Sequence, residues 1–238
     1  MSRPKLLDLF CCEAGAGMGY HRAGFDVTGV DLFKHKNAKG KTVGFSQKRY
    51  PFRSHQADAI EFVKEHGREY DVIHASPPCQ HASIATSSLD RSEYPRLIEP
   101  TREALIATDR PYVIENVAGS ALLNPLMLCG SMFDLTAIDD DGTPLRLERH
   151  RLFESNIQWL AAPRPDYHDS RVRVAGSYGG ARRDKYEARH VRHGGYVPSV
   201  AVQRRLLGID WMTEGGMHQS VPPSYTEWLG KQLMAHIT

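Results

Sequence analysis

The sequence predicts an α/β fold with a mostly parallel, Rossmann-like sheet and helices on both faces. Short apolar runs at 5–10, 26–30, 71–74 and 111–114 are typical of buried strands. They alternate with segments of helical periodicity, as at 98–108. A glycine-rich turn follows the first run, and polar residues stand where several runs end. In such sheets the chemistry lies at the carboxyl ends of the strands, so we expect the site there.

The 238 residues, 41% of them hydrophobic, suffice for one α/β domain with a small appendage. We expect a catalytic and cofactor-binding core at 1–155, a reduced, basic and irregular region at 156–200, and a segment at 201–238 that returns to the core. We expect no membrane partner, because no apolar run approaches the roughly 18–20 residues that span a bilayer. Four cysteines, two of them adjacent, do not resemble a disulfide framework, which favours a reducing cytoplasm.

The first predicted strand leads into a turn with glycines at 15, 17 and 19, and the next strand ends at Asp31. Glycines let the backbone approach a ligand, and an acid at the end of the second strand can bind ribose hydroxyls. The turn begins Cys11-Cys12-Glu13-Ala14-Gly15, which departs from the GxGxxG pattern of dinucleotide sites. This spacing favours S-adenosylmethionine as the cofactor over a dinucleotide.

Two further strands end in residues that suit catalysis. The run Asp71–His74 leads into a loop in which two prolines precede Cys79, a placement that suits a nucleophile. The alternative for an isolated cysteine is a buried, inert thiol. The strand 111–114 ends at Glu115, and a buried glutamate is either paired or catalytic.

Asp58 and the segment 82–97 each allow two interpretations. Asp58 stands where a third strand is expected to end and would accept a hydrogen bond from an adenine amino group, or it would cap the helix predicted at Ala59–His66. The polar segment 82–97 is either a loop that closes over substrate or plain surface.

Taken together, these motifs resemble those of the cytosine-5 DNA methyltransferases. Residues 7–10, Gly15, Gly19 and 23–25 are similar to that family's first motif, and Pro77-Pro78-Cys79-Gln80 to its nucleophile motif. Further along, Glu115-Asn116-Val117 resembles the glutamate motif, Arg149-His150-Arg151 the paired-arginine motif, and 219–230 the last motif. The matches follow the family's order and cover most of the chain apart from about 156–200.

The resemblance implies a methyltransferase fold that uses S-adenosylmethionine to methylate C5 of a cytosine flipped out of DNA. Cys79 would add to C6, Glu115 would hold or protonate N3, and Arg151 with Arg149 would contact the base and phosphate. The expected cofactor contacts are Phe10 on adenine, Asp31 on ribose, Asp58 on the adenine amino group, Gln219 and Ser220 near the methionine end, and also Gly15 and Pro77. Three departures (Cys12 and Ala14 for glycines, Gln219 for asparagine, Leu147 for glutamine) remove no group that this chemistry requires.

The region between the arginine pair and the last motif is short, since 156–199 holds only 44 residues. Its surroundings are basic, because residues 164–205 contain ten Lys or Arg and four acids although the whole chain carries a net charge of only +2. We expect phosphate contacts and short or relaxed sequence specificity, whereas the alternative is a solvated loop. The expected nucleic-acid contacts are Gln80, Arg171, Arg173, Arg182, Arg183 and Arg189.

Several alternatives stay open at this point. The same chemistry would act on RNA or a free cytosine nucleotide, and a non-catalytic nucleic-acid-binding module or a dinucleotide-dependent oxidoreductase would share the fold. We expect a monomer, with or without a specificity partner, in a bacterial or phage-infected cytoplasm. No metal site is expected, although His190 and His193, with His168 nearby in the sequence, offer a weak zinc pattern.

Overall fold

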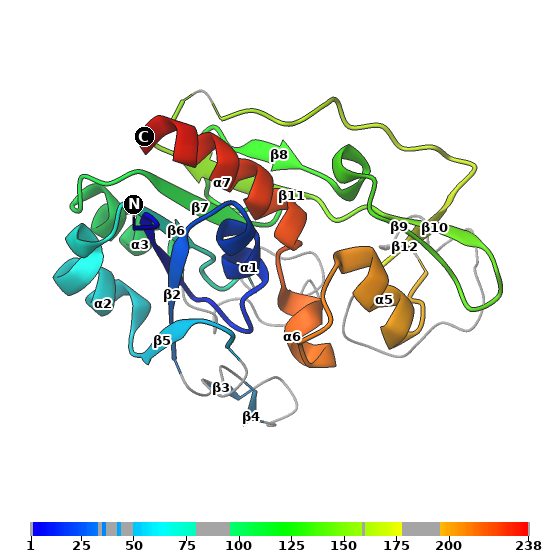
Figure 1. Cartoon of the computed structure of the whole chain (residues 1–238), viewed down its shortest axis with the longest axis horizontal. Coiled ribbons are helices and arrows are strands. Elements are labelled where there is room, and N and C mark those ends of the chain that lie inside the picture. Colours follow the sequence, from blue (N-terminus) through cyan, green and yellow to red (C-terminus); the bar gives the residue numbers. More distant parts are fainter. Residues whose placement is uncertain are drawn as a thin grey trace.

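The computed structural model describes residues 2–32, 35–36, 42–43, 50–79, 96–158, 160–177 and 196–237. Its main sheet has seven strands in the order β5-β2-β1-β6-β7-β11-β8 (Figure 1). The strands are β5 (Arg53–Gln56), β2 (Asp26–Asp31), β1 (Lys5–Leu9), β6 (Val72–Ala75), β7 (Tyr112–Asn116), β11 (Arg151–Ser155) and β8 (Leu126–Leu128). The first five pair in parallel, whereas β11 runs antiparallel to both β7 and β8.

Helices cover both faces of this sheet, as the sequence predicts. On one face α1 (Gly15–Arg22) and α7 (Pro223–Ile237) pack against the sheet, and on the other α2 (Ala59–His66) and α3 (Ile98–Ile106) do so. Alternation along each strand divides the buried side chains, so Leu6 and Val72 face α1 and α7 while Leu7 and Ile73 face the other pair. The predicted α/β, mostly parallel Rossmann-like fold is therefore confirmed.

The antiparallel direction of β11 has a consequence for the site. Phe153 pairs with Glu115 and Leu152 with Asn116, so the first residue of β11, Arg151, lies at the carboxyl end of β7. An antiparallel strand thus brings its amino end to the edge where the parallel strands end. The sequence pattern did not predict this strand direction.

A second, smaller sheet lies beside the first. It consists of β12 (Arg173–Ala175), β10 (Pro144–Leu147) and β9 (Thr136–Ile138), and packs with α5 (Val200–Leu207) around its own apolar cluster. Figure 1 shows this sheet and α5 at the opposite end of the molecule from α2 and α3, with α6 (Glu214–Gln219) between α5 and α1. The three predicted segments are therefore interleaved, because strands from 136–147 pair with 173–175 and pack on 200–207. A two-stranded pair, β3 (His35–Lys36) with β4 (Thr42–Val43), completes the described strands.

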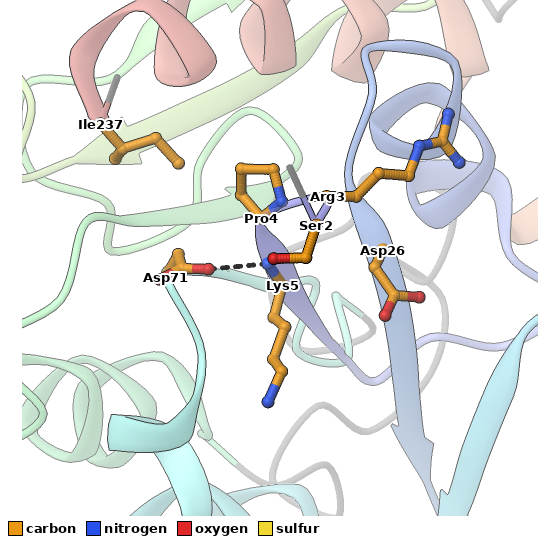
Figure 2. Close-up of a pocket in the computed structure, with 7 residues that line it drawn as sticks. All are labelled: Ser2, Arg3, Pro4, Lys5, Asp26, Asp71 and Ile237. Atoms are coloured by element: carbon orange, nitrogen blue, oxygen red, sulfur yellow. Dashed lines mark hydrogen bonds between the residues drawn. The ribbon is translucent and has the colours of Figure 1, made fainter.

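A hollow of about 490 Å³ lies at the amino ends of β1, β2 and β6 (Figure 2). Residues from both ends of the described chain line it, since Pro4 and Ile237 both border it. Beside them, the Lys5 backbone N–H donates to Asp71 Oδ2 at 2.7 Å. This edge is opposite to the one where the predicted site residues gather. Among the described residues, none of the helices has the length and apolar character that crossing a bilayer requires.

Candidate active site

The register of the central strands places the predicted catalytic residues at one edge of the sheet. Ala75, the last residue of β6, pairs with Ile114 of β7, so Ser76 and the following loop continue beside Glu115. The buried Asn116 side chain fixes this loop, because its Nδ2 donates to the Pro77 carbonyl at 2.9 Å while its Oδ1 accepts from the Val117 N–H. The end of β7 therefore holds the Pro-Pro-Cys loop in place.

Glu115 is buried and forms an ion pair with Arg151. Nε of Arg151 lies 2.9 Å from Oε1 of Glu115, and the two side chains are only 15% and 8% exposed. Burial raises the pKa of Glu115, and this effect outweighs the opposing influence of Arg151, of a hydrogen bond from Ser76 and of Arg149. A carboxyl group with a raised pKa holds a proton more readily than an ordinary glutamate, which is the direction that the predicted role requires.

Cys79 lies in the same electrostatic environment. Burial raises the pKa of its thiol above the ordinary value, the charge of Glu115 raises it further, and Arg151 and Arg149 partly offset both. The protein alone therefore keeps Cys79 mainly as the thiol at neutral pH. A bound substrate that neutralises Glu115 would remove one of the two causes that raise the pKa of Cys79 and so would favour the thiolate.

A hydrogen-bonded chain beneath Glu115 was not predicted from the sequence. The Tyr20 hydroxyl lies 3.1 Å from His74 Nδ1, His74 Nε2 lies 2.8 Å from Ser76 Oγ, and Ser76 hydrogen-bonds to Glu115. Burial lowers the pKa of His74 to about 3, so its ring is neutral and carries one N–H. If Ser76 gives its proton to the carboxylate, His74 must donate from Nε2 and accept the Tyr20 proton at Nδ1. A histidine inside the apolar run 71–74 was the available signal for this chain.

Arg149 is held differently from Arg151. It is 2% exposed, and its guanidinium donates to the Ser177 carbonyl at 2.8 Å and to the His218 carbonyl at 2.7 Å. Its own carbonyl accepts from the Tyr225 hydroxyl at 2.8 Å. Arg149 therefore ties the small region and the C-terminal segment to the core, and its charge still reaches Cys79 and Glu115.

The turn after β1 has unusual backbone geometry. Phe10, Cys12 and Ala14 have φ values of 58°, 47° and 68°, in the left-handed region that non-glycine residues rarely adopt. Such strain concentrates at ligand-binding turns. Asp31 supports the turn, because Oδ2 accepts from the Cys12 N–H at 2.8 Å and Oδ1 accepts from the Leu32 N–H at 2.7 Å. A carboxylate held at this turn stands where nucleoside-binding sheets place the acid that contacts ribose hydroxyls, which fits a nucleoside-bearing cofactor.

The C-terminal segment packs directly on this turn. A Cβ at Gly15 would lie 2.7 Å from the Val221 carbonyl and 2.8 Å from Ser220 Cβ, so only glycine permits the contact. Glu13 accepts hydrogen bonds from the Thr213 N–H at 2.6 Å and the Thr213 hydroxyl at 2.7 Å. Gly15 and Ser220, two of the predicted cofactor contacts, therefore lie side by side. Ser220 is buried and Gln219 is exposed at the end of α6.

The remaining predicted cofactor contacts, Asp58, Phe10 and Pro77, lie on three separate segments. Asp58 is exposed and caps α2, with Oδ1 accepting from the Ile60 and Glu61 N–H groups at 2.9 and 3.0 Å. Oδ1 of Asp58 therefore caps α2, which is one of the two roles that the sequence allows. Phe10 is half-buried beside the α2–α3 core, and Pro77 is buried with its carbonyl bound by Asn116.

The predicted nucleic-acid contacts are only partly described. Arg171 is largely exposed and pairs with Asp169 at 2.8 Å. Arg173 lies 3.7 Å from Asp139 and 3.5 Å from Asp141, with its guanidinium over the Tyr196 ring. Both arginines are thus engaged by acids or an aromatic ring of the same chain. Gln80, Arg182, Arg183, Arg189 and most of 82–97 lie outside the described residues, as do His190 and His193.

The main sheet is parallel except for β11, which lies antiparallel between β7 and β8. Comparison with solved structures shows that this is a Rossmann-like methyltransferase fold. A DNA modification methyltransferase encoded within an E. coli prophage matches 98% of this chain and 99% of its own with a TM-score of 0.56 and 16% identity. The S. pombe Dnmt2 methyltransferase matches with a TM-score of 0.57 and 12% identity over 99% of both chains. A triple mutant of Spodoptera frugiperda DNMT2 gives 0.56 and 14%, over 97% of this chain and 99% of that one. No protein-family model and no curated protein sequence matches the chain. The expected methyltransferase fold is thereby confirmed, and the resemblance noted in the motifs extends to the fold.

Proposed function

We propose that the protein is an S-adenosylmethionine-dependent methyltransferase that modifies C5 of cytosine in DNA. The observation that carries this proposal is the grouping of Cys79, Glu115 and Arg151 at the adjoining ends of β6, β7 and β11. A thiol, a proton-holding carboxyl and a guanidinium are the three groups that addition to a cytosine ring needs. The fold of the solved neighbours, one of which is described as a DNA modification methyltransferase, supports the same class.

In the proposed reaction the Cys79 sulfur forms a bond to C6 of the cytosine, and its thiol proton leaves. Glu115 hydrogen-bonds at N3 and offsets the negative charge that addition places on the ring. S-adenosylmethionine, when bound at the turn after β1, supplies the methyl group. The C5 hydrogen then leaves as a proton, the bond between Cys79 and C6 breaks, and the thiol is restored.

Arg151 has a double role in this scheme. In the protein alone its Nε pairs with Glu115, and its Nη1 donates to the His150 carbonyl at 2.9 Å. With substrate present, the same guanidinium would bind the cytosine O2 or a phosphate. The buried Arg149 is the better candidate for holding this arginine segment in place than for reaching a substrate.

We propose that Phe10, Gly15, Asp31 and Ser220 surround the cofactor, with Asp58, Pro77 and Gln219 at its margins. The strained turn and the fixed Asp31 carboxylate support this assignment. The short region 156–200 supports short or relaxed sequence specificity. We further propose the predicted division at 155 and 200 as functional segments, although they interleave in space.

The same chemistry on RNA or a free cytosine nucleotide is the second candidate. The pairing of Arg171 and Arg173 with acids of the same chain favours the free nucleotide, because it engages two arginines expected to contact backbone phosphates, which DNA and RNA share. The non-catalytic binding module is less well supported, because it would give no reason for a buried glutamate with a raised pKa beside a thiol.

The test is transfer of labelled methyl groups from S-adenosylmethionine to duplex DNA, single-stranded DNA, RNA and dCTP. We expect label at cytosine C5 of DNA with the wild-type protein and none with Cys79→Ser. A denaturant-stable protein–DNA adduct on a 5-fluorocytosine substrate would identify the nucleophile independently. Label confined to RNA or dCTP would select the second candidate, and cofactor binding without transfer to any of them would reject both.

A further inference from the structure

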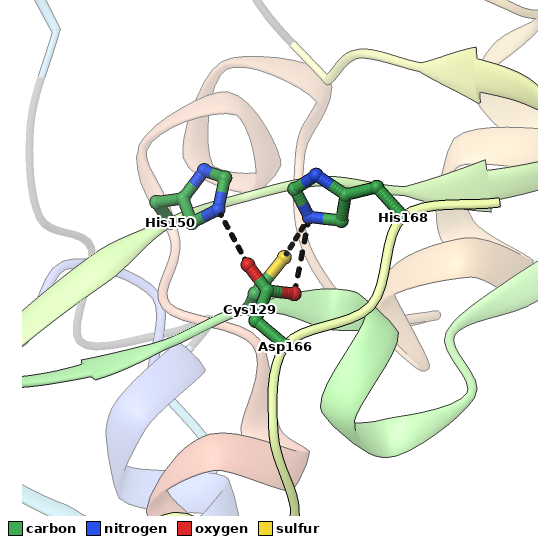
Figure 3. Close-up of side chains that lie close together, drawn as sticks. All are labelled: Cys129, His150, Asp166 and His168. Carbon is green, nitrogen blue, oxygen red and sulfur yellow. Dashed lines mark hydrogen bonds and ion pairs between the residues drawn. The ribbon is translucent and has the colours of Figure 1, made fainter. Parts of the chain in front are cut away.

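A second group of reactive side chains lies where β8 ends and β11 begins. Leu128 pairs with Arg151, so Cys129 and His150, the residues just beyond, lie side by side. Asp166 and His168, from the chain that follows β11, complete the group (Figure 3). Each residue offers one ligand atom, and all four atoms lie within 4.8 Å of one another.

The distances between these atoms fit a single small ion. Cys129 Sγ lies 3.3 Å from His168 Nε2, which is 3.0 Å from Asp166 Oδ1. His150 Nε2 lies 3.1 Å from Asp166 Oδ2. Zinc binds sulfur at about 2.3 Å and nitrogen or oxygen at about 2.0–2.2 Å, so its tetrahedral ligands lie about 3.3–3.7 Å apart. The two distances to Asp166 involve its two different oxygens, and the ligand atoms lie up to 4.8 Å apart, so side-chain movements of up to about 1 Å would bring all four to that spacing.

The chemistry of the group selects zinc among the common ions. One thiol, two imidazoles and one carboxylate are all zinc ligands, whereas magnesium and calcium take oxygen almost alone. Cys129 is fully buried and both histidines are partly exposed, so the sulfur is shielded while the ion can enter from the surface.

Neighbouring side chains orient the ligands as they do at metal sites. The far nitrogen of His168, Nδ1, faces Glu148 Oε1 at 3.5 Å, while its Nε2 points into the group. Arg146 Nε in turn donates to the same Glu148 oxygen at 2.7 Å, and the Ser131 hydroxyl donates to Asp166. A carboxylate behind a ligating histidine fixes its tautomer and strengthens its basicity.

We propose that Cys129, His150, Asp166 and His168 form a structural zinc site. The site joins the end of β8, the start of β11 and the chain at 166–168, which leads towards β12 of the small sheet. His150 stands between Arg149 and Arg151, so the ion would fix the segment that carries the partner of Glu115. This inference concerns metal binding and holds whatever the methyl acceptor is.

The test uses the full chain, expressed without a polyhistidine tag and purified without chelator, and measures its zinc by mass spectrometry. We expect about one zinc per chain. Cys129→Ser and His168→Gln should lose most of it, whereas the matched thiol control Cys79→Ser should keep it. Cysteine at 79 is also the proposed nucleophile, so the control separates the two proposals: it abolishes methyl transfer and leaves the metal in place.

A second measurement does not depend on the variants folding. The wild-type protein stripped of metal is titrated with Co²⁺, and a tetrahedral site with one thiolate gives intense visible bands and a sulfur-to-metal charge-transfer band in the near ultraviolet. The melting temperature should rise on adding Zn²⁺ and fall with chelator. No cobalt spectrum and no change in melting temperature with the wild type would overturn the proposal. A zinc content in Cys129→Ser equal to that of the wild type would also overturn it.

Discussion

Arg151 of β11 and Glu115 of β7 meet across an antiparallel strand pair, with Nε and Oε1 2.9 Å apart and both side chains largely buried. The contact joins two segments that lie 36 positions apart in the sequence and places a positive and a negative charge beside Cys79. The two charges shift the pKa of the thiol in opposite directions, since Glu115 raises the pKa of Cys79 and Arg151 lowers it. The reactivity of Cys79 therefore reports on both partners.

Alkylation of Cys79 should be slow at neutral pH and should accelerate as pH rises, because the reactive thiolate forms only as pH approaches a pKa that burial has raised. Glu115→Gln removes a charge that raises this pKa, so Cys79 should react several-fold faster at pH 8 although methyl transfer falls. Iodoacetamide labelling followed by mass spectrometry of the Cys79 peptide measures the rate. Glu69→Gln, an exposed change far from the site, is the control. An unchanged or slower rate in Glu115→Gln would show that Glu115 does not govern the thiol.

The stability of the ion pair should depend on both partners together. Arg151→Met leaves Glu115 buried without its partner and should cost about 3–5 kcal/mol of unfolding free energy. Adding Glu115→Gln to that variant should restore most of the loss, because no buried charge then remains unpaired. The exposed pair Arg53–Asp26 is the matched control, and Arg53→Met should cost less than about 1 kcal/mol. Urea unfolding of the single and double variants measures these energies, and additive losses in the double variant would contradict the coupling.

Asp8 should make the protein less stable as pH rises. It is 1% exposed on β1, and burial raises its pKa from 3.8 to about 7, an effect that the hydrogen bond from Tyr50 only partly offsets. A carboxyl group with a raised pKa contributes stability that is full below about pH 4 and is lost as pH rises through 7. The change from 3.8 to about 7 corresponds to about 4 kcal/mol.

Asp8→Asn removes this titration, so its stability relative to the wild type should improve by up to about 4 kcal/mol between pH 4 and pH 8. Urea unfolding of both proteins across this range measures the difference, and His74 and the other groups cancel because they titrate in both. Parallel curves for Asp8→Asn would mean that Asp8 is charged in the folded protein throughout.

The sequence predicted the elements whose signals are local. The runs that became β1, β2, β6 and β7 were recognised because each is short, apolar and followed by a turn, and the helix at Ala59–His66 has the predicted bounds. Cys79 and Glu115 were proposed as site residues because each follows such a run. Local patterns do not contain strand direction and pairing, which place Arg151 beside Glu115 and give the two arginines different contacts.

Residues brought together by distant segments were missed for the same reason. Cys129 reads as a core residue in its own apolar context, and His168 was considered with His190 and His193 because these histidines lie near one another in the sequence. Only the pairing of β8 with β11 brings Cys129 to His150. His74 lies within a buried strand, and its hydrogen bond to Tyr20 depends on α1 packing over β6, whereas its contact with Ser76 is local.

The close contact between α1 and α7 should require that Gly19 has no side chain. A Cβ at Gly19 would overlap the Thr226 hydroxyl and the Pro223 carbonyl, so Gly19→Ala must push α7 away from α1. Overpacking of this kind typically costs about 1–3 kcal/mol, and the upper part of that range is expected because one of the two obstacles is backbone. Gly215→Ala is the matched control, since a Cβ there meets nothing within 4 Å and replaces a helical glycine of α6. It should leave stability unchanged or raise it by up to about 1 kcal/mol.

Because α7 follows Ser220, which packs on Gly15, Gly19→Ala should also weaken S-adenosylmethionine binding, measured by calorimetry, while Gly215→Ala should not. Equal effects of the two substitutions on both stability and binding would show that the C-terminal segment is not held through Gly19.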